Sequence, residues 1–137
     1  MSTDAKIALL IAEDDQNLRT LMEAAARHAG GFDPIVTAPD GQAALDAVRN
    51  GAVHPDLIVT DLSMPRMTGI ELIRALKRDP ATRAIPVAVV TSSDIANDRE
   101  DALVAGAQSF WAKPHGFDAL IALLNGIRES CRALTAH

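Results

Sequence analysis

Five polar residues follow short apolar runs in this chain and could act together chemically: Glu13, Asp14, Asp61, Thr91 and Lys113. They supply carboxylates, a hydroxyl and an ammonium group. Each run is rich in branched or aromatic residues and precedes a helical pattern, which predicts parallel strands buried on both faces. The carboxyl ends of such strands share one crevice, where open α/β sheets bind ligands. We therefore expect the five side chains to meet at one edge of a sheet.

The carboxylates in this set indicate a cation site. At about 4 Å and an effective dielectric constant near 20, two like charges repel by roughly 4 kcal/mol. Glu13, Asp14 and Asp61 can share one rim only if a carboxyl group takes up a proton or a cation lies among them. Hard carboxylate oxygens suit Mg²⁺ completed by water and phosphate. The histidines are far apart in the sequence and lack the spacing of zinc ligands.

Thr91 and Lys113 indicate what this site would act on. A hydroxyl, an ammonium group and a divalent cation around one aspartate would hold a phosphoryl group by its oxygens. Transfer of that group to a carboxylate requires in-line positioning and neutralisation of charge on the equatorial oxygens. The residue types therefore predict that Asp61 is a nucleophile that forms an aspartyl-phosphate.

Apolar periodicity and helix caps predict the elements that position these residues. Asp15 and Asp40 are placed to cap helices, and Thr68 with Glu71 forms a capping box. The expected strands are residues 7–12, 33–38, 57–60, 86–90 and 109–112; the helix after the fourth strand covers 97–105, and the last helix carries Phe117, Leu120, Ile121, Leu124 and Ile127 along one stripe. Strands and helices alternate strictly, which predicts an α/β fold with a doubly wound, five-stranded parallel sheet.

Size, charge and composition exclude several classes of protein. A chain of 137 residues suits one domain, expected to span 1–137 with a core of about 6–129. A net charge of −5 and scattered basic residues argue against a nucleic-acid-binding surface. No apolar run approaches the roughly 20 residues that span a bilayer. The only cysteine, Cys131, cannot form an internal disulfide, so we expect a cytoplasmic protein without membrane contact.

The motifs around the polar residues resemble the receiver domain of two-component response regulators, from Ile7 to about Arg128. They are Ala-Glu-Asp-Asp after the first strand, Asp-Leu-Ser-Met-Pro from Asp61, Thr68-Gly69, Val-Thr-Ser around Thr91 and Ala-Lys-Pro around Lys113. Their order and spacing fit the family, specifically its stand-alone members that are similar to chemotaxis regulators. The resemblance implies a flavodoxin-like sheet with strand order 2-1-3-4-5.

The resemblance also implies roles for the acidic residues and one loop carbonyl. Asp61 would be the phosphoacceptor, Asp14 a direct Mg²⁺ ligand, and Glu13 an acid that binds the ion through water. The backbone carbonyl of Ser63 would complete the protein ligands of the metal. Lys113 would pair with the acyl phosphate, and the Lys113-Pro114 peptide is similar to one that is typically cis in the family.

Two further residues match the positions at which the family switches conformation. Thr91 would move toward the phosphoryl group, and Phe110, the aromatic three residues before Lys113, would turn inward behind it. Phe110 lacks the hydroxyl of a tyrosine, so the switch must act through packing. Ser63 and Ser93 match positions that tune the lifetime of the phosphoryl group; both are small and polar, and we expect a moderate lifetime.

The function that the resemblance implies is a phosphorylation-activated signalling switch. A histidine kinase or phosphotransfer protein would donate to Asp61 with Mg²⁺, and the output would be contact with a downstream protein at residues 97–129. The protein would assist its own phosphorylation and dephosphorylation without being an enzyme in the ordinary sense. We expect a monomer or weak homodimer, because the last helix is loosely similar to that of phytochrome-partnered receivers.

Other functions remain open at this point. The chain could be a phosphorelay intermediate, a phosphate sink, or the receiver part of a hybrid histidine kinase. A dehalogenase-type phosphohydrolase would need a second aspartate where Ser63 stands, and a flavin carrier would need a neutral phosphate loop where Glu13 and Asp14 stand. A receiver-like module that acts without phosphorylation usually lacks the acceptor, an acid or the lysine, and none is missing here.

Overall fold

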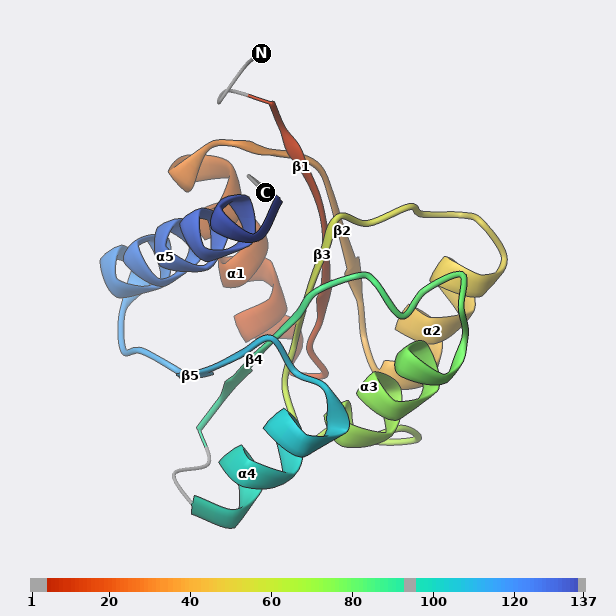
Figure 1. Ribbon diagram of the computed structural model, residues 1–137. Coiled ribbons are helices and arrows are strands. Elements are labelled where there is room, and N and C mark those ends of the chain that lie inside the picture. The colour runs from red at the N-terminus through yellow and green to blue at the C-terminus, as the bar shows by residue number, and fades with distance from the viewer. Residues whose placement is uncertain (1–4, 93–95, 136–137) are drawn as a thin grey trace.

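The computed structural model describes residues 5–92 and 96–135, which form five strands and five helices in strict alternation (Figure 1). In chain order they are β1 (Ile7–Ala12), α1 (Gln16–Ala29), β2 (Phe32–Ala38), α2 (Gly41–Arg49), β3 (Leu57–Thr60), α3 (Gly69–Arg78), β4 (Val87–Thr91), α4 (Ala96–Ala105), β5 (Ser109–Ala112) and α5 (Phe117–Thr135). Ser93 lies outside the described residues.

The strands form one parallel sheet in the order β2-β1-β3-β4-β5, which confirms the predicted flavodoxin-like arrangement. Ala12 pairs with Thr60 across β1 and β3, and Thr91 pairs with Ala112 across β4 and β5. The residues that follow β1 and β3 are therefore neighbours at one edge of the sheet, and so are those that follow β4 and β5.

The observed element boundaries differ from the predicted ones by single residues. β4 covers Val87–Thr91 where residues 86–90 were expected. Pro86 has no backbone N–H for the ladder, whereas Thr91 continues the ladder because it pairs with Ala112. β2 begins at Phe32, which pairs with Ile7.

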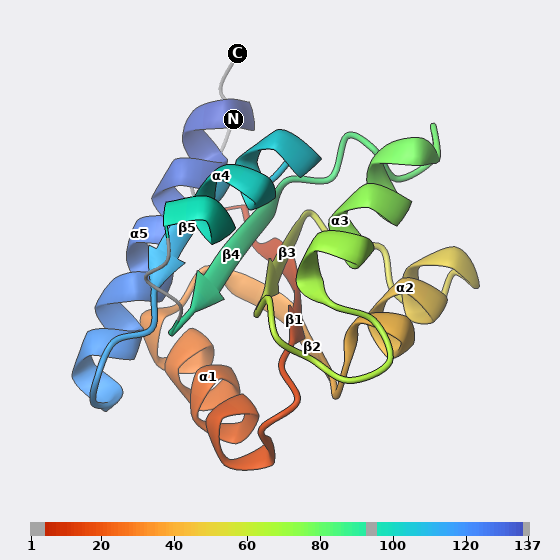
Figure 2. The ribbon, with the colours of Figure 1, turned by 90° about the horizontal axis from the view of Figure 1, so that it is seen from below.

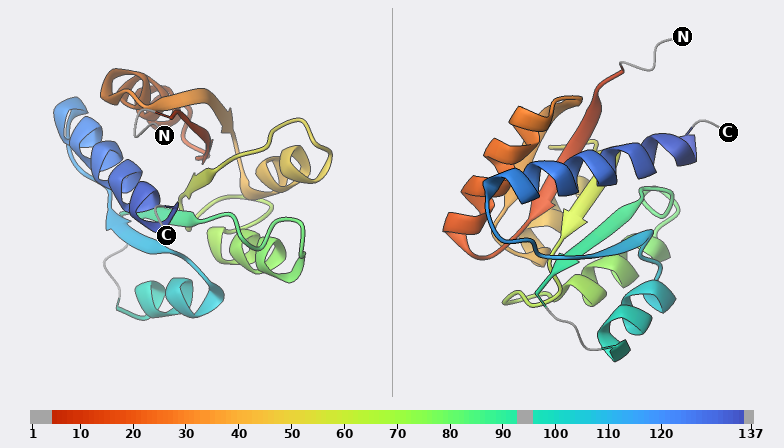
Figure 3. Two further views of the ribbon diagram at one scale, coloured as in Figure 1. Left: turned by 45° about the horizontal axis from the view of Figure 1, so that its top comes forward. Right: turned by 90° about the vertical axis from the view of Figure 1, so that its left-hand side faces the viewer.

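Helices cover both faces of the sheet and create two apolar cores (Figures 2 and 3). α1 and α5 pack side by side on one face, while α2, α3 and α4 pack on the other. Side chains alternate along β1, where Leu9 and Ile11 face the first core and Leu10 and Ala12 the second. This alternation follows from the two-residue period of a strand.

β5 places its two aromatic residues on opposite faces of the sheet. Trp111 is half-buried against the α1/α5 core, and its indole N–H donates to Ser109 Oγ at 2.7 Å. Phe110 is half-buried against the core formed with α3 and α4. Neither ring is fully enclosed, because β5 is an edge strand.

The expected apolar stripe of α5 is confirmed except at its first residue. Leu120, Leu124 and Ile127 are buried, but Phe117 remains 36% exposed. Phe117 begins the helix at the rim of the core, and its ring makes an edge contact with the His28 ring at a centroid distance of 6.0 Å. Within the described residues, no helix combines the length and apolar character needed to cross a membrane.

An ion pair joins the start of α2 to the loop between β3 and α3. Asp40 caps α2 by accepting from the Ala43 N–H at 2.8 Å, and its other oxygen accepts from Arg66 Nη2 at 2.8 Å. Arg66 has φ 67°, and the Met67 N–H donates to the Pro65 carbonyl across it at 2.7 Å. Such a tight turn is strained for a residue other than glycine, and the ion pair holds Arg66 in it.

The cap at Asp40 should make stability depend on pH. Burial favours a higher pKa for Asp40, but the Ala43 N–H and the Arg66 guanidinium outweigh it and hold the pKa below its ordinary value. A carboxyl group with a lowered folded-state pKa stabilises the fold above its unfolded-state pKa, and this contribution is lost as pH falls through the folded-state pKa. Asp40→Ala should lower the free energy of unfolding by about 1–2 kcal/mol at pH 7.

Urea unfolding from pH 7 downward measures this effect. The difference in the free energy of unfolding between wild type and Asp40→Ala should shrink below about pH 4, as the Asp40 carboxyl group takes up its proton. Asp40→Asn is the matched control, because asparagine keeps the cap but does not titrate. Equal stability of wild type and Asp40→Ala at pH 7 would contradict the assignment of Asp40 as a stabilising cap of α2.

Candidate functional site: an acidic cluster with a buried lysine

Three of the predicted acidic residues gather at the carboxyl edge of the sheet. Glu13 and Asp14 follow β1, Asp61 follows the neighbouring β3, and one oxygen from each lies within 4.8 Å of the other two. Glu13 is 1% exposed and Asp61 6% exposed, whereas Asp14 faces solvent. The three carboxylates therefore form a cluster that is buried on one side and open on the other.

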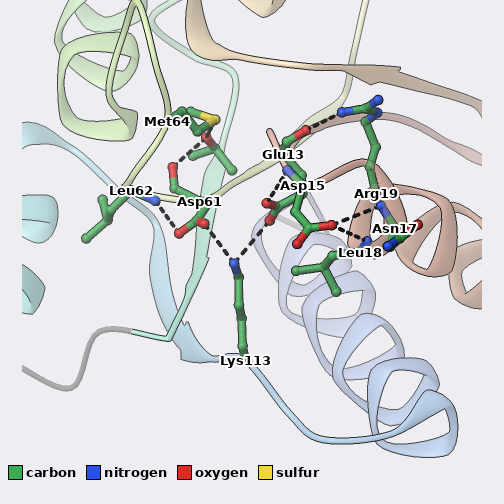
Figure 4. A network of polar contacts seen from close by, with 10 residues as sticks. Glu13, Asp15, Asn17, Leu18, Arg19, Asp61, Leu62, Met64 and Lys113 are labelled. Atoms are coloured by element: carbon green, nitrogen blue, oxygen red, sulfur yellow. Dashed lines mark hydrogen bonds and ion pairs between the residues drawn. The ribbon is translucent and has the colours of Figure 1, made fainter.

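Lys113 reaches this cluster from the end of β5 (Figure 4). Its Nζ lies 2.7 Å from Asp61 Oδ2 and 3.2 Å from Glu13 Oε1. Its backbone N–H donates to the Thr91 carbonyl at 2.9 Å, which extends the pairing of β5 with β4. One ammonium group thus bridges two buried carboxylates that come from different strands.

The electrostatics of the cluster follow from its burial and its lysine. Burial raises the pKa of Glu13 above its ordinary value, although the Asp15 N–H and the Lys113 ammonium act in the opposite direction. Burial alone would lower the pKa of Lys113, but the hydrogen bond and charge of Asp61, with a smaller contribution from Glu13, raise it above its ordinary value. Lys113 is therefore fully charged at neutral pH.

Backbone contacts hold Asp61 in place. Its Oδ1 accepts from the Leu62 N–H at 2.7 Å, and its own N–H donates to the Ala12 carbonyl at 3.2 Å. Thr60 Oγ1 donates to the Asp61 carbonyl at 2.9 Å. The Gly69 N–H donates to the Leu62 carbonyl at 2.9 Å and closes the loop onto the start of α3. With one carboxylate oxygen on Leu62 and the other on Lys113, the Asp61 side chain has a defined orientation.

Thr91 is the last residue of β4 and is 2% exposed at the same edge of the sheet as the cluster. Phe110 is half-buried on the neighbouring strand β5, where it pairs with Val89 of β4. Ser63 lies in the loop after Asp61 with an exposed side chain. The Lys113-Pro114 peptide is trans, against the expectation, since the cis bond among the described residues is Asp33–Pro34.

One contact to the cluster was not predicted from the sequence. Arg19, in the first turn of α1, donates from Nη1 to the Glu13 carbonyl at 2.8 Å (Figure 4). The sequence signal available for this contact was a basic residue shortly after two acids. That signal is not specific, because arginine is common on amphipathic helices. The contact also needs the chain to turn at Asp15, whose carboxylate caps α1 by accepting from the Asn17 and Leu18 N–H groups.

Comparison with known proteins shows the family to which the fold belongs. The family of response regulator receiver domains matches residues 9–125. The chain belongs to this family. The two-component response regulator ORR41 of Oryza sativa subsp. japonica is 33% identical over 122 residues, which cover 89% of this chain and 94% of that protein. Response regulator PleD of Caulobacter vibrioides is 37% identical over 106 residues, covering 77% of this chain and 22% of PleD.

Solved structures agree with this family membership. The phosphorylated cyanobacterial phytochrome response regulator RcpA has a TM-score of 0.83 and 27% identity, covering 91% of this chain and 93% of that one. The chain is therefore a receiver domain of the two-component response regulator type, a family consistent with phosphorylation-dependent signalling. The chain spans nearly all of ORR41 but only about a fifth of PleD, so the same module occurs both nearly alone and within much longer proteins.

The donor set fits the Mg²⁺ that receiver domains bind in an acidic pocket. Among the described residues, Glu13, Asp14 and Asp61 form the one group of three or more potential side-chain ligands gathered this closely. All three offer carboxylate oxygens, which are the ligands that hard divalent cations prefer. An exposed Asp14 gives an ion access from solvent, and the buried Glu13 and Asp61 supply the negative charge behind it.

Gly69, the first residue of α3, should tolerate no side chain. A Cβ at Gly69 would collide with the Asp61 carbonyl and approach the Leu62 Cα, both of them backbone atoms. Gly69→Ala should therefore lower the free energy of unfolding by about 1–3 kcal/mol. Gly126→Ala is the matched control, because its Cβ would meet only Trp111 ring carbons at 3.5 Å.

Urea unfolding of both variants tests this close approach. Gly126 lies inside α5, where alanine is favoured over glycine by about 1 kcal/mol, so Gly126→Ala should stabilise the protein. The two glycine-to-alanine changes should thus shift stability in opposite directions. Unchanged or higher stability of Gly69→Ala would show that Gly69 does not pack as tightly as described.

Proposed function

We propose that this receiver domain is a phosphorylation-activated switch in which Asp61 accepts a phosphoryl group from a phosphohistidine of a histidine kinase or phosphotransfer protein. The observation that carries the proposal is the Lys113 ammonium, 2.7 Å from the Asp61 carboxylate within a cluster of acids. A carboxylate that only capped a turn would not need an ion pair with a lysine that follows β5.

The chemistry assigned to Asp61 is nucleophilic attack on phosphorus. An Asp61 carboxylate oxygen forms the new P–O bond, the P–N bond of the phosphohistidine breaks, and the imidazole keeps the electron pair. The Leu62 N–H on Oδ1 and the Lys113 ammonium on Oδ2 fix the direction from which the carboxylate attacks. Positioning of this kind is the main contribution a protein makes to phosphoryl transfer.

Lys113 would change partners during the reaction. Before transfer its single positive charge offsets part of the negative charge of the Asp61 and Glu13 carboxylates. Afterwards the acyl phosphate carries more negative charge than the free carboxylate, and the ammonium would pair with a phosphoryl oxygen. Its contacts with Asp61 and Glu13 raise its pKa, so the lysine is charged before transfer.

The proposed ligands of Mg²⁺ are the carboxylates of Asp14 and Asp61, the Glu13 carboxylate through water, and the backbone carbonyl of Ser63. When bound, the ion neutralises charge on the phosphoryl oxygens. The sequence order supports the set, because Glu13 and Asp14 are adjacent after β1 and Ser63 follows Asp61 in one loop. The remaining positions would be filled by water and phosphate oxygens.

The switch would couple the site to α4, β5 and α5. In this proposal the Thr91 hydroxyl contacts the phosphoryl group and Phe110 moves inward behind it, so that phosphorylation favours one of two packings of the β4–α4 region. α4 exposes Val104 at 81% and Leu103 at 41%, which provides an apolar contact for a downstream protein at residues 97–129. In this proposal the protein acts as a cytoplasmic monomer or weak homodimer that signals through protein contact alone.

A second function uses the same chemistry. As a phosphorelay intermediate, a phosphate sink or the receiver of a hybrid kinase, the chain would pass the phosphoryl group from Asp61 to a histidine or to water. A histidine or a water molecule could approach the phosphoryl group from the solvent-exposed side of the cluster, where Asp14 lies. The lifetime of the aspartyl-phosphate separates these roles.

Acetyl phosphate and intact-mass measurement test the acceptor. Wild type should gain one phosphoryl group only when Mg²⁺ is present, since the cluster must be neutralised before a phosphate can approach. Asp61→Asn should gain none, because an amide is not a nucleophile at neutral pH. Asp118→Asn, an exposed aspartate in the first turn of α5, is the matched control and should behave as wild type. Unchanged phosphorylation of Asp61→Asn would exclude Asp61 as the acceptor.

Thermal unfolding tests the metal site without any phosphoryl transfer. An ion that binds only the folded state raises the melting temperature with its concentration. Mg²⁺ should raise the melting temperature of wild type, and Asp14→Asn should lose most of this response. The control is Asp15→Asn, which keeps the helix cap and removes an acid outside the cluster. An equal response to Mg²⁺ in Asp14→Asn and wild type would contradict the ligand set.

A further inference from the structure

Glu13 has its backbone and side-chain polar atoms held from several directions. Its N–H donates to the Ala38 carbonyl at 3.0 Å. Its Oε2 accepts from the Asp15 N–H at 3.1 Å, and its Oε1 lies 3.2 Å from Lys113 Nζ. Its carbonyl accepts from Arg19 Nη1 at 2.8 Å, as Figure 4 shows. The first three contacts join Glu13 to the sheet, the turn and the lysine, and the fourth joins it to a side chain of α1.

The Arg19 contact acts on the peptide that links the two acids after β1. A peptide unit is planar, so an anchored carbonyl oxygen fixes the orientation of the whole plane. That plane ends at the Cα of Asp14, from which the exposed carboxylate of the cluster projects. Arg19 therefore restricts the direction in which the Asp14 side chain leaves the backbone, although it lies outside the group of three acids.

We propose that Arg19 is a positioning residue that sets the divalent-cation affinity of the acidic cluster by holding the Glu13–Asp14 peptide. This inference rests on the proposed function, because it concerns the metal site assigned there. Partners one contact removed from the ligands commonly orient them and change metal affinity by large factors when removed. Arg19 is half-buried, and its guanidinium donates to a backbone carbonyl, so it acts through geometry.

The charge of Arg19 by itself would have the opposite effect. A positive charge near the cluster repels a dication, so removal of that charge alone would tighten metal binding. Loss of the hydrogen bond frees the Glu13–Asp14 peptide and weakens binding. The sign of the change in affinity therefore separates a positioning residue from a merely nearby charge.

Arg27 provides a control on the same helix. It pairs with Glu23 at 2.6 Å on the exposed side of α1, and its side chain is 62% exposed. Arg27→Met removes the same charge as Arg19→Met without touching the cluster. Methionine keeps an unbranched apolar stem and a high helix propensity in both variants.

The experiment titrates Mn²⁺, a hard cation that accepts the same oxygen ligands, and follows the EPR signal of the free ion. Arg19→Met should raise the Mn²⁺ dissociation constant roughly tenfold, and Arg19→Lys should recover part of the loss because its ammonium can still donate to a carbonyl. Arg27→Met should stay within about twofold of wild type, since an exposed charge is screened by salt. Urea unfolding of each variant shows that the compared proteins are folded.

Each outcome decides the proposal. Unchanged or tighter Mn²⁺ binding in folded Arg19→Met overturns it, and so does an equal loss in Arg27→Met. If Arg19→Met does not fold, Arg19→Lys replaces it: a weaker affinity than that of wild type supports the proposal, and an unchanged affinity overturns it. If wild type itself binds no Mn²⁺, the proposed metal site fails and this inference fails with it.

Discussion

The contact between the Lys113 ammonium and the Asp61 carboxylate is the interaction on which the geometry of this site depends. Asp61 and Glu13 are almost completely buried within a few ångströms of each other, and two such charges without a cation would repel strongly. Removing one member of a buried, hydrogen-bonded ion pair costs about 3–5 kcal/mol, because the other member is left uncompensated. The lysine therefore offsets part of the charge of the acids while leaving their solvent side open.

The sheet makes this contact possible. Lys113 follows β5 and Asp61 follows β3, with β4 between them, so the lysine must cross the end of one strand to reach its partner. Parallel pairing brings the carboxyl ends of these strands to one edge, and the two apolar cores keep the strands in register from both faces. A shift of one residue in β5 would turn Phe110 and Trp111 to the wrong cores and move the lysine away from the acids.

Family membership explains the fold of the chain but does not specify its downstream function. The chain matches nearly the full length of ORR41 but a small part of PleD, so receiver domains of similar sequence belong to proteins of very different size. The chemistry lies at the carboxyl edge of the sheet, whereas the exposed apolar residues Leu103 and Val104 lie on α4. The separation of these two regions would allow the proposed phosphorylation site to serve different partners.

The sequence by itself determined the elements, the caps and the positions of the polar residues that follow strands. These features depend on residues within a few positions of one another, such as the apolar run of β1 or the Thr68–Glu71 capping box. One element boundary moved because Pro86 has no N–H for the ladder, and β2 gained Phe32 through its pairing with Ile7. The tertiary structure alone decided that Arg19 reaches the Glu13 carbonyl, that Arg66 pairs with Asp40 and that Phe117 stays at the rim. Those contacts depend on the paths of loops and on the placement of helices. Neither produces a periodic pattern in the sequence.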